Sequence, residues 1–248
     1  MSISTFLDSV DLEGLETYAT DNFTATSGFL PSPGVEQAAV VGNELQSFAP
    51  GVPSVARLAL QNAMLQAQLH AKKVAPNNTV AWYESYFETL VALGLISDEQ
   101  AHVFQRSTAI EGDVEKALLE LIAAIVGGAA TTTVAIVAAA VGALKRLGDD
   151  SPAITIFKRE SKSVTGRFQV SHAYPVDDSV GVLLVAMTVD ASAVFTEVLF
   201  FKVHVQQATL KQTTARFLTT VESLSLEADH IAKKVADFRE GYISQLEI

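Results

Sequence analysis

The chain has 248 residues with 28 acidic and 17 basic side chains and no cysteine, and 49% of its residues are hydrophobic. This content suits a folded domain with one large core and excludes a mainly disordered chain. The missing thiol excludes disulfides, cysteine-ligated metals and cysteine nucleophiles. A net charge of −11 opposes general binding to nucleic acid, which needs a basic surface. We therefore expect one acidic domain, residues 1–248, that binds no nucleic acid.

Residues 1–52 are predicted to form an acidic, extended arm of this domain. Seven acidic residues precede the first basic residue, Arg57, and four of the seven prolines lie at or before Pro53. Proline favours extended and turn conformations. Two interpretations stay open: a solvated lead-in that lies over the domain, or a removable or exchangeable pro-segment. The start also lacks the positive residues and apolar stretch of a secretory signal peptide. We expect a soluble protein that is cytoplasmic when made and leaves, if released, by another route.

The first half beyond the arm has apolar residues at helical spacing. The pattern predicts helices from Ser54 to before Pro76, from Thr79 to Gly94, from Asp113 to Gly127 and from Thr131 to Gly148. The second of these carries an aromatic stripe that is typical of a core-facing helix: Trp82, Tyr83, Tyr86 and Phe87.

The second half has apolar residues in alternation, and this pattern predicts strands. The expected strands are 153–160, 164–174, 180–189, 195–206 and 211–221, followed by a helix over 225–246. Since short turns connect them, we expect an antiparallel meander. The run 180–189 is apolar on both faces and must be covered on both sides. The predicted fold is therefore α+β with three layers, α/β/α: an antiparallel sheet wrapped by helical hairpins, with an added C-terminal helix.

An uncharged stretch of 24 residues lies between Glu120 and Lys145. It is long enough to cross a bilayer, but alanine, glycine and threonine fill much of it and Gly127-Gly128 interrupts it. We interpret it as a tight helical hairpin whose small residues allow close packing. Such a hairpin is compatible with water while it is packed and with lipid when it is released.

No local signature of a hydrolase, metalloprotease, nucleotide-binding enzyme or dinucleotide enzyme occurs, so we expect no enzymatic activity and no cofactor. The histidines are scattered singly, and no metal site is predicted, although His172 and His204 could meet across the sheet. A pocket under the Trp82 helix could hold an apolar ligand. One basic patch is predicted, and it could meet anionic head groups or balance the acidic arm. Its members are Lys158, Arg159, Lys162 and Arg167.

The order of elements, with an uncharged hairpin followed by AITIFKRES and the strand FTEVLFFKVHV, resembles the Cyt-type δ-endotoxins over residues 52–222. Fungal volvatoxin and a bacterial insect-virulence factor share that fold. The resemblance implies a soluble protein that opens at a membrane and lyses the cell, with an N-terminal segment that mediates dimer contact until it is removed. The aromatic helix and the C-terminal helix depart from the family's pattern and could brace the fold against opening.

The leading hypothesis is a membrane-active cytolytic or pore-forming protein with membrane lipid as a conditional partner and a homo-oligomer formed through the arm. The alternative is a non-lytic, self-assembling structural or interaction protein on the same fold. The candidate membrane-interacting residues lie on the hairpin and on two strands: Leu118, Ile122, Ile125, Val134, Val137, Val141, Leu183, Val185, Val198, Leu199, Phe200 and Phe201.

Overall fold

The computed structural model describes residues 2–13, 15, 37–97, 106–126, 130–161, 166–191 and 204–247. Helices and strands of one sheet make up this part of the chain, which confirms the α+β class. The elements, in chain order, are α1 (Ile3–Ser9), β1 (Gln37–Val41), β2 (Glu44–Phe48), α2 (Ser54–Val74), α3 (Thr79–Ala92), β3 (Ile96–Ser97), β4 (Arg106–Asp113), α4 (Val114–Val126), α5 (Ala130–Arg146), α6 (Pro152–Ser161), β5 (Gly166–Val176), β6 (Ser179–Ala191), β7 (His204–Thr220), α7 (Val221–Lys234), a 3-10 turn η3 (Ala236–Phe238), α8 (Arg239–Tyr242) and β8 (Ile243–Glu247).

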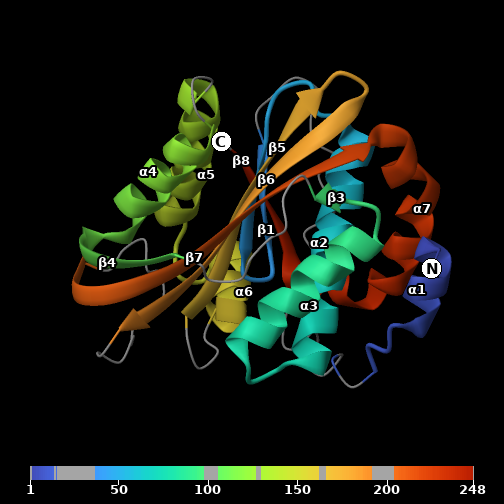
Figure 1. The fold of residues 1–248 in the computed structure, drawn as a ribbon, viewed down its shortest axis with the longest axis horizontal. Coiled ribbons are helices and arrows are strands. Elements are labelled where there is room, and N and C mark those ends of the chain that lie inside the picture. Colours follow the sequence, from blue (N-terminus) through green and yellow to red (C-terminus); the bar gives the residue numbers. More distant parts are fainter. Residues whose placement is uncertain are drawn as a thin grey trace.

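The sheet has eight strands in the order β3-β7-β6-β5-β2-β1-β8, and β4 pairs with β7 beside this path. Strand β7 runs the length of the sheet in Figure 1 and binds β4 and β3 along different stretches of its outer edge. The pair β2 and β5 is parallel, and the other described pairs are antiparallel. The prediction of a purely antiparallel sheet is therefore wrong at the pair β2 and β5, because the hairpin formed by β1 and β2 adds to the sheet beside β5.

Helices cover both faces of the sheet, as the three-layer prediction requires (Figure 1). One layer contains α1, α2, α3 and α7, and the other contains α4, α5 and α6. Successive residues of β6 serve the two cores in turn: Val182 and Leu184 pack with the first layer, and Leu183 and Val185 with the second. The strand that reads as apolar on both faces is thus buried on both.

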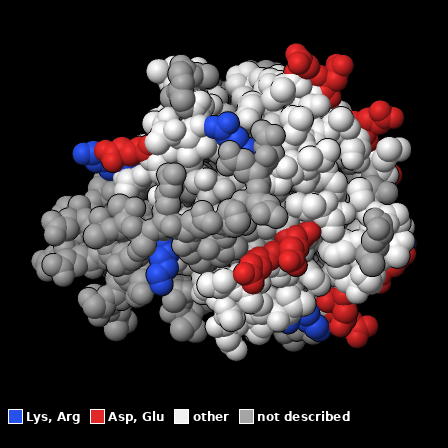
Figure 2. Space-filling view, viewed as in Figure 1, with Lys and Arg blue, Asp and Glu red and all other residues white. Residues whose placement is uncertain are grey.

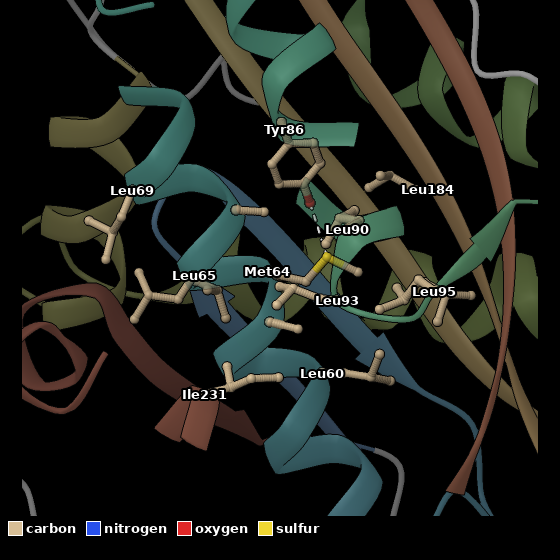
Figure 3. Packing of buried hydrophobic residues seen from close by; sticks show 14 of the residues in the cluster. Leu60, Met64, Leu65, Leu69, Tyr86, Leu90, Leu93, Leu95, Leu184 and Ile231 are labelled. Carbon is tan, nitrogen blue, oxygen red and sulfur yellow. Dashed lines mark hydrogen bonds between the residues drawn. The ribbon is translucent and has the colours of Figure 1, made fainter. Parts of the chain in front are cut away.

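The helices α2 and α3 form the core of the first layer, and both were predicted. Asn78 caps α3 by accepting a hydrogen bond from the Ala81 N–H. Figure 3 shows how the two helices meet: Tyr86 of α3 points its hydroxyl at Met64 of α2, with leucines of both helices around them. The predicted aromatic stripe is core, since Trp82, Tyr83, Tyr86 and Phe87 are all buried.

Residues 153–160 form helix α6, so the predicted strand is wrong. The residues Ala153, Ile154, Ile156 and Phe157 are buried, and their spacing fits one face of a helix rather than the alternation of a strand. Pro152 is the first helical residue, and the Ser151 hydroxyl accepts a hydrogen bond from the Ile154 N–H at 3.3 Å. The Ser-Pro pair is a helix-start signal that outweighs the short alternation.

Two further boundaries differ from the sequence prediction. The expected turn at 208–210 does not form, because β7 continues through it while pairing with β6 from Ala191 to Ser179. The expected helix over 225–246 ends at Lys234, and the chain returns through η3 and α8 to the edge strand β8. Strand β8 pairs with β1 in full register, so sheet pairing decides the conformation of the C-terminal residues.

The N-terminal residues are not an extended arm throughout. Residues 37–48 form the β1–β2 hairpin in the interior of the sheet, with β8 on one side and β5 on the other. Leu7, Val10, Leu12 and Leu15 are buried in the first core. The solvated lead-in is therefore wrong for these residues; residues 16–36 lie outside the described part of the chain.

Candidate functional site

The α4–α5 hairpin is the first candidate site, and its predicted inner residues are buried against the sheet. Leu118, Ile122, Val137 and Val141 belong to the second core, and Ile125 and Val134 are partly buried beside it. Among the described residues, no helix combines the length and the apolar character that a membrane crossing requires. The hairpin prediction is confirmed, and it consists of two separate helices.

The strand β6 completes the same cluster, because Leu183 and Val185 face the hairpin layer. The structure thus brings eight of the twelve predicted membrane-interacting residues into one apolar core. The other four, Val198 to Phe201, lie outside the described residues.

The charges of the hairpin lie at its base and along the first half of α4. Lys145 near the end of α5 contacts Glu115 at the start of α4 at 2.5 Å, and this pair joins the two helices to each other. Toward the tip, the side chain of Arg216 on β7 donates a hydrogen bond to the Ile125 carbonyl. Lys116 and Glu120 are exposed on α4 and pair with each other at 3.8 Å. Beyond Glu120, the exposed side chains on α4 and on α5 before Lys145 are small, and they include Ala124 and Ala135. The hairpin therefore has an apolar inner face, and its described outer face carries no charge between Glu120 and Lys145.

The predicted basic patch does not form one surface. Lys158 pairs with Asp149 at 2.9 Å, whereas Arg159 and Arg167 line a pocket. Lys162 lies outside the described residues. Acidic side chains on the visible face gather over the α3 and α7 side of the molecule (Figure 2). Two of the four predicted cations, Arg159 and Arg167, therefore meet in this pocket, apart from Lys158.

The pocket has a volume of about 270 Å³ and lies where the two helical layers meet at one end of the sheet. Layer one contributes α2, α3 and α8, layer two contributes α6, and the sheet contributes the β1–β2 turn and the start of β5. The lining residues are Asn43, Gln68, Leu69, Lys72, Pro76, Trp82, Arg159, Glu160, Arg167 and Tyr242.

Three cations and one carboxylate set the charge of this pocket. Glu160 contacts Lys72 at 2.9 Å and Arg159 at 2.6 Å. Arg159 also lies over the Tyr242 ring, 4.6 Å from its centroid. Burial lowers the pKa of Lys72, but the charge of the neighbouring Glu160 and the contacts with Tyr242 outweigh burial and raise this pKa above its usual value. The Lys72 side chain is therefore a charged ammonium.

Arg167 differs from the other two cations because it forms no ion pair with a carboxylate among the described residues, although the charge of Glu160 acts on it from a greater distance. It is 6% exposed, its guanidinium lies 4.9 Å from the centroid of the Trp82 ring, and its Nε has no hydrogen-bond partner. Burial lowers the pKa of Arg167 from its usual value. A buried guanidinium remains charged in spite of such a shift, and a charge left without a partner is costly.

A buried carboxyl group lies behind the pocket. Glu44 on β2 is fully buried and accepts hydrogen bonds from Tyr86 at 2.6 Å, Ser171 at 2.6 Å and Gln46 at 3.1 Å. Gln68 joins this group to the pocket, since it lines the pocket and also donates to Glu44 at 3.4 Å. Burial raises the pKa of Glu44, and the donated hydrogen bonds oppose that shift.

The sequence reasoning missed Glu44, Gln68, Lys72 and Glu160. A signal was present in residues 61–68 of α2, where four amide side chains interrupt an otherwise apolar helix: Gln61, Asn62, Gln66 and Gln68. All four are buried. Buried amides need hydrogen-bond partners, so they indicate a polar region inside the fold.

His172 and His204, which could have met across the sheet, lie on strands that β6 separates. His172 is instead buried against Ser47, with its Nδ1 3.0 Å from the hydroxyl oxygen. No cluster of three or more potential metal-binding side chains occurs in the described ranges.

No protein-family model and no curated protein matches the chain. Among solved structures, the chain is similar to the Evf virulence factor, with a TM-score of 0.33 and 14% sequence identity over 94% of this chain and 90% of that chain. A similarity this low supports no conclusion about function. The resemblance to the Cyt-type toxins stays a prediction, and the proposals below rest on the residues described above.

Proposed function

We propose that this protein is membrane-active, of a cytolytic or pore-forming type, and that the α4–α5 hairpin leaves the sheet to enter lipid. The proposal rests on one observation: the hairpin and the two-sided apolar strand β6 bury the same core, and the hairpin has no charge between Glu120 and Lys145. No step of this proposal involves enzyme chemistry or a cofactor.

Energetics allow such an exchange. Apolar surface gains about 25 cal/mol per Å² whether it is hidden in a protein core or in lipid. Moving the hairpin from sheet to bilayer therefore keeps most of the hydrophobic gain. The ion pair between Glu115 and Lys145 lies at the base of the hairpin, so both charges stay near the membrane surface while the tip enters.

Vesicle leakage tests the proposal with variants that change only the outer face of the hairpin. Ala124→Asp and Ala135→Asp place a charge at exposed positions, where the folded protein tolerates it. A charge within an inserted helix costs about 2.5–3.5 kcal/mol, which corresponds to roughly a 100-fold loss of insertion. We expect both variants to fold normally and to release far less dye than the wild type.

Leu226→Asp is the matched control, because Leu226 on α7 is 75% exposed and lies outside the hairpin. It should leak dye like the wild type. Equal leakage by all four proteins would exclude insertion of the hairpin. No leakage by the wild type from anionic or zwitterionic vesicles, intact or protease-trimmed, would favour the non-lytic interaction protein.

A further inference from the structure

The pocket at the end of the sheet has an electrostatic character opposite to that of the chain. Its lining contains Lys72, Arg159 and Arg167 against one carboxylate, Glu160, so its formal charge is +2 in a protein of net charge −11. Concentrating cations in an acidic protein costs free energy unless an anion compensates them. This charge reversal points to a binding site for an anion.

Arg167 is the residue of the pocket that most clearly indicates an anion site. It is buried, it lies over the Trp82 ring, and its Nε has no hydrogen-bond partner among the described residues. The guanidinium is therefore held at the pocket wall without an ion pair in the described part of the chain. Guanidinium groups present donors in a planar fork that matches two oxygens of a phosphate or a carboxylate. Neither the membrane proposal nor the packing of the core requires a cation there.

We propose that this pocket binds a small phosphomonoester, held by Arg167, Arg159 and Lys72. The excess charge of the lining equals that of a phosphomonoester dianion, and about 270 Å³ accommodates a small polar molecule. Glu160 holds Lys72 and Arg159 in place through its two ion pairs. Since charged side chains line so much of the pocket, the structure favours an anion over the apolar ligand expected from the sequence.

Calorimetric titration of the full chain with glycerol 3-phosphate, inorganic phosphate and acetate tests the proposal. Saturable binding of the phosphomonoester, tighter than that of acetate, is the expected result. Arg167→Lys keeps the charge but loses the planar fork, and Arg159→Gln removes a cation whose side chain is 25% exposed. Each variant should bind glycerol 3-phosphate with an affinity at least tenfold lower than that of the wild type.

Lys158→Gln is the matched control, since Lys158 lies one residue before Arg159 and pairs with Asp149 outside the pocket lining. It should bind like the wild type. Equal affinity of Arg159→Gln and Lys158→Gln would overturn the proposal, as would acetate binding as tightly as the phosphomonoester or no saturation in the wild type.

A last arm separates two sources of the same chemistry. Vesicles that contain phosphatidic acid present a phosphomonoester as a lipid head group, whereas glycerol 3-phosphate presents it free in solution. If such vesicles displace glycerol 3-phosphate from the wild type, the pocket accepts the head group; if they do not, it accepts only the soluble compound. Both results depend on the pocket and neither depends on leakage, so this test can succeed or fail independently of the membrane proposal.

Discussion

Replacing Tyr86 by phenylalanine tests the importance of the hydrogen bonds to the buried Glu44. The Tyr86 hydroxyl donates to the Glu44 carboxyl at 2.6 Å and lies 3.1 Å from the Met64 sulfur (Figure 3). Tyr86→Phe removes this donor and leaves the aromatic packing intact. Because a hydrogen bond to a charged group contributes about 1.5–3 kcal/mol, we expect the free energy of unfolding to fall by about 2 kcal/mol.

Tyr83→Phe is a matched control on the same helix. Its hydroxyl is equally buried but donates to the backbone carbonyls of Phe168 and Met187, which carry no charge. We expect a loss of about 1 kcal/mol that does not change with pH.

The pH dependence distinguishes the two variants. Burial raises the pKa of Glu44 above its ordinary 4.5, so the folded protein holds a proton that the unfolded chain has released, and this contribution to stability declines as the pH rises. The donor at Tyr86 matters most when Glu44 is charged. Urea unfolding from pH 5 to 9 should therefore show the loss from Tyr86→Phe growing with pH. A loss no larger than that of Tyr83→Phe at every pH would refute the reasoning.

Three further predictions concern stability. Burial lowers the pKa of His172 to about 4, below its ordinary 6.5, so the unfolded chain takes up a proton first as the pH falls. The free energy of unfolding of the wild type should therefore fall by on the order of 3 kcal/mol from pH 6.5 to pH 4. Urea unfolding of His172→Gln should show a weaker dependence on pH over this range. Gly42→Ala places a Cβ 2.1 Å from the Gln68 side chain at a residue whose φ is +58°. Gly51→Ala is its control, because the φ of Gly51 is also left-handed, at +91°, but the nearest atom to the added Cβ is 3.5 Å away. Thermal unfolding should show a larger decrease in melting temperature for Gly42→Ala than for Gly51→Ala. Deleting residues 1–52 removes β1 and β2 and should abolish cooperative unfolding followed by circular dichroism; a truncated chain with a sharp transition would contradict the fold.

The first-half helices were predictable because local signals there agree with the packing. Helix α3 has a capping Asn78, a long apolar face and a glycine just beyond its end, and the structure places all three as the pattern requires. The run 180–189 was equally clear, since a strand that is apolar on both faces has few other places in a fold.

The errors lie where distant pairing decides the conformation. The residues of β8 take their strand conformation from β1, some 200 positions earlier in the chain, and no local pattern reports that. The β1–β2 hairpin does carry a local signal in Gly42-Asn43, a two-residue turn between the apolar β1 and the more polar β2, with Gly42 at a φ of +58°. Surrounding prolines and acidic residues concealed it. The pocket was not predictable as a unit, because its lining comes from segments spread between Asn43 and Tyr242 that only the fold brings together.

The position of this hairpin restricts how the protein could be activated by cleavage. Ala38 and Val40 of β1 pack in the core under α4 and α5, Ala39 and Val41 pack in the opposite core, and Asn43 reaches the pocket. One short segment therefore contributes to both cores and to the candidate binding site. A cut that removed the β1–β2 hairpin would leave β8 without its described partner strand and β5 paired on one side only, rather than release the α4–α5 hairpin alone. Any removable pro-segment compatible with this fold must end before Gln37.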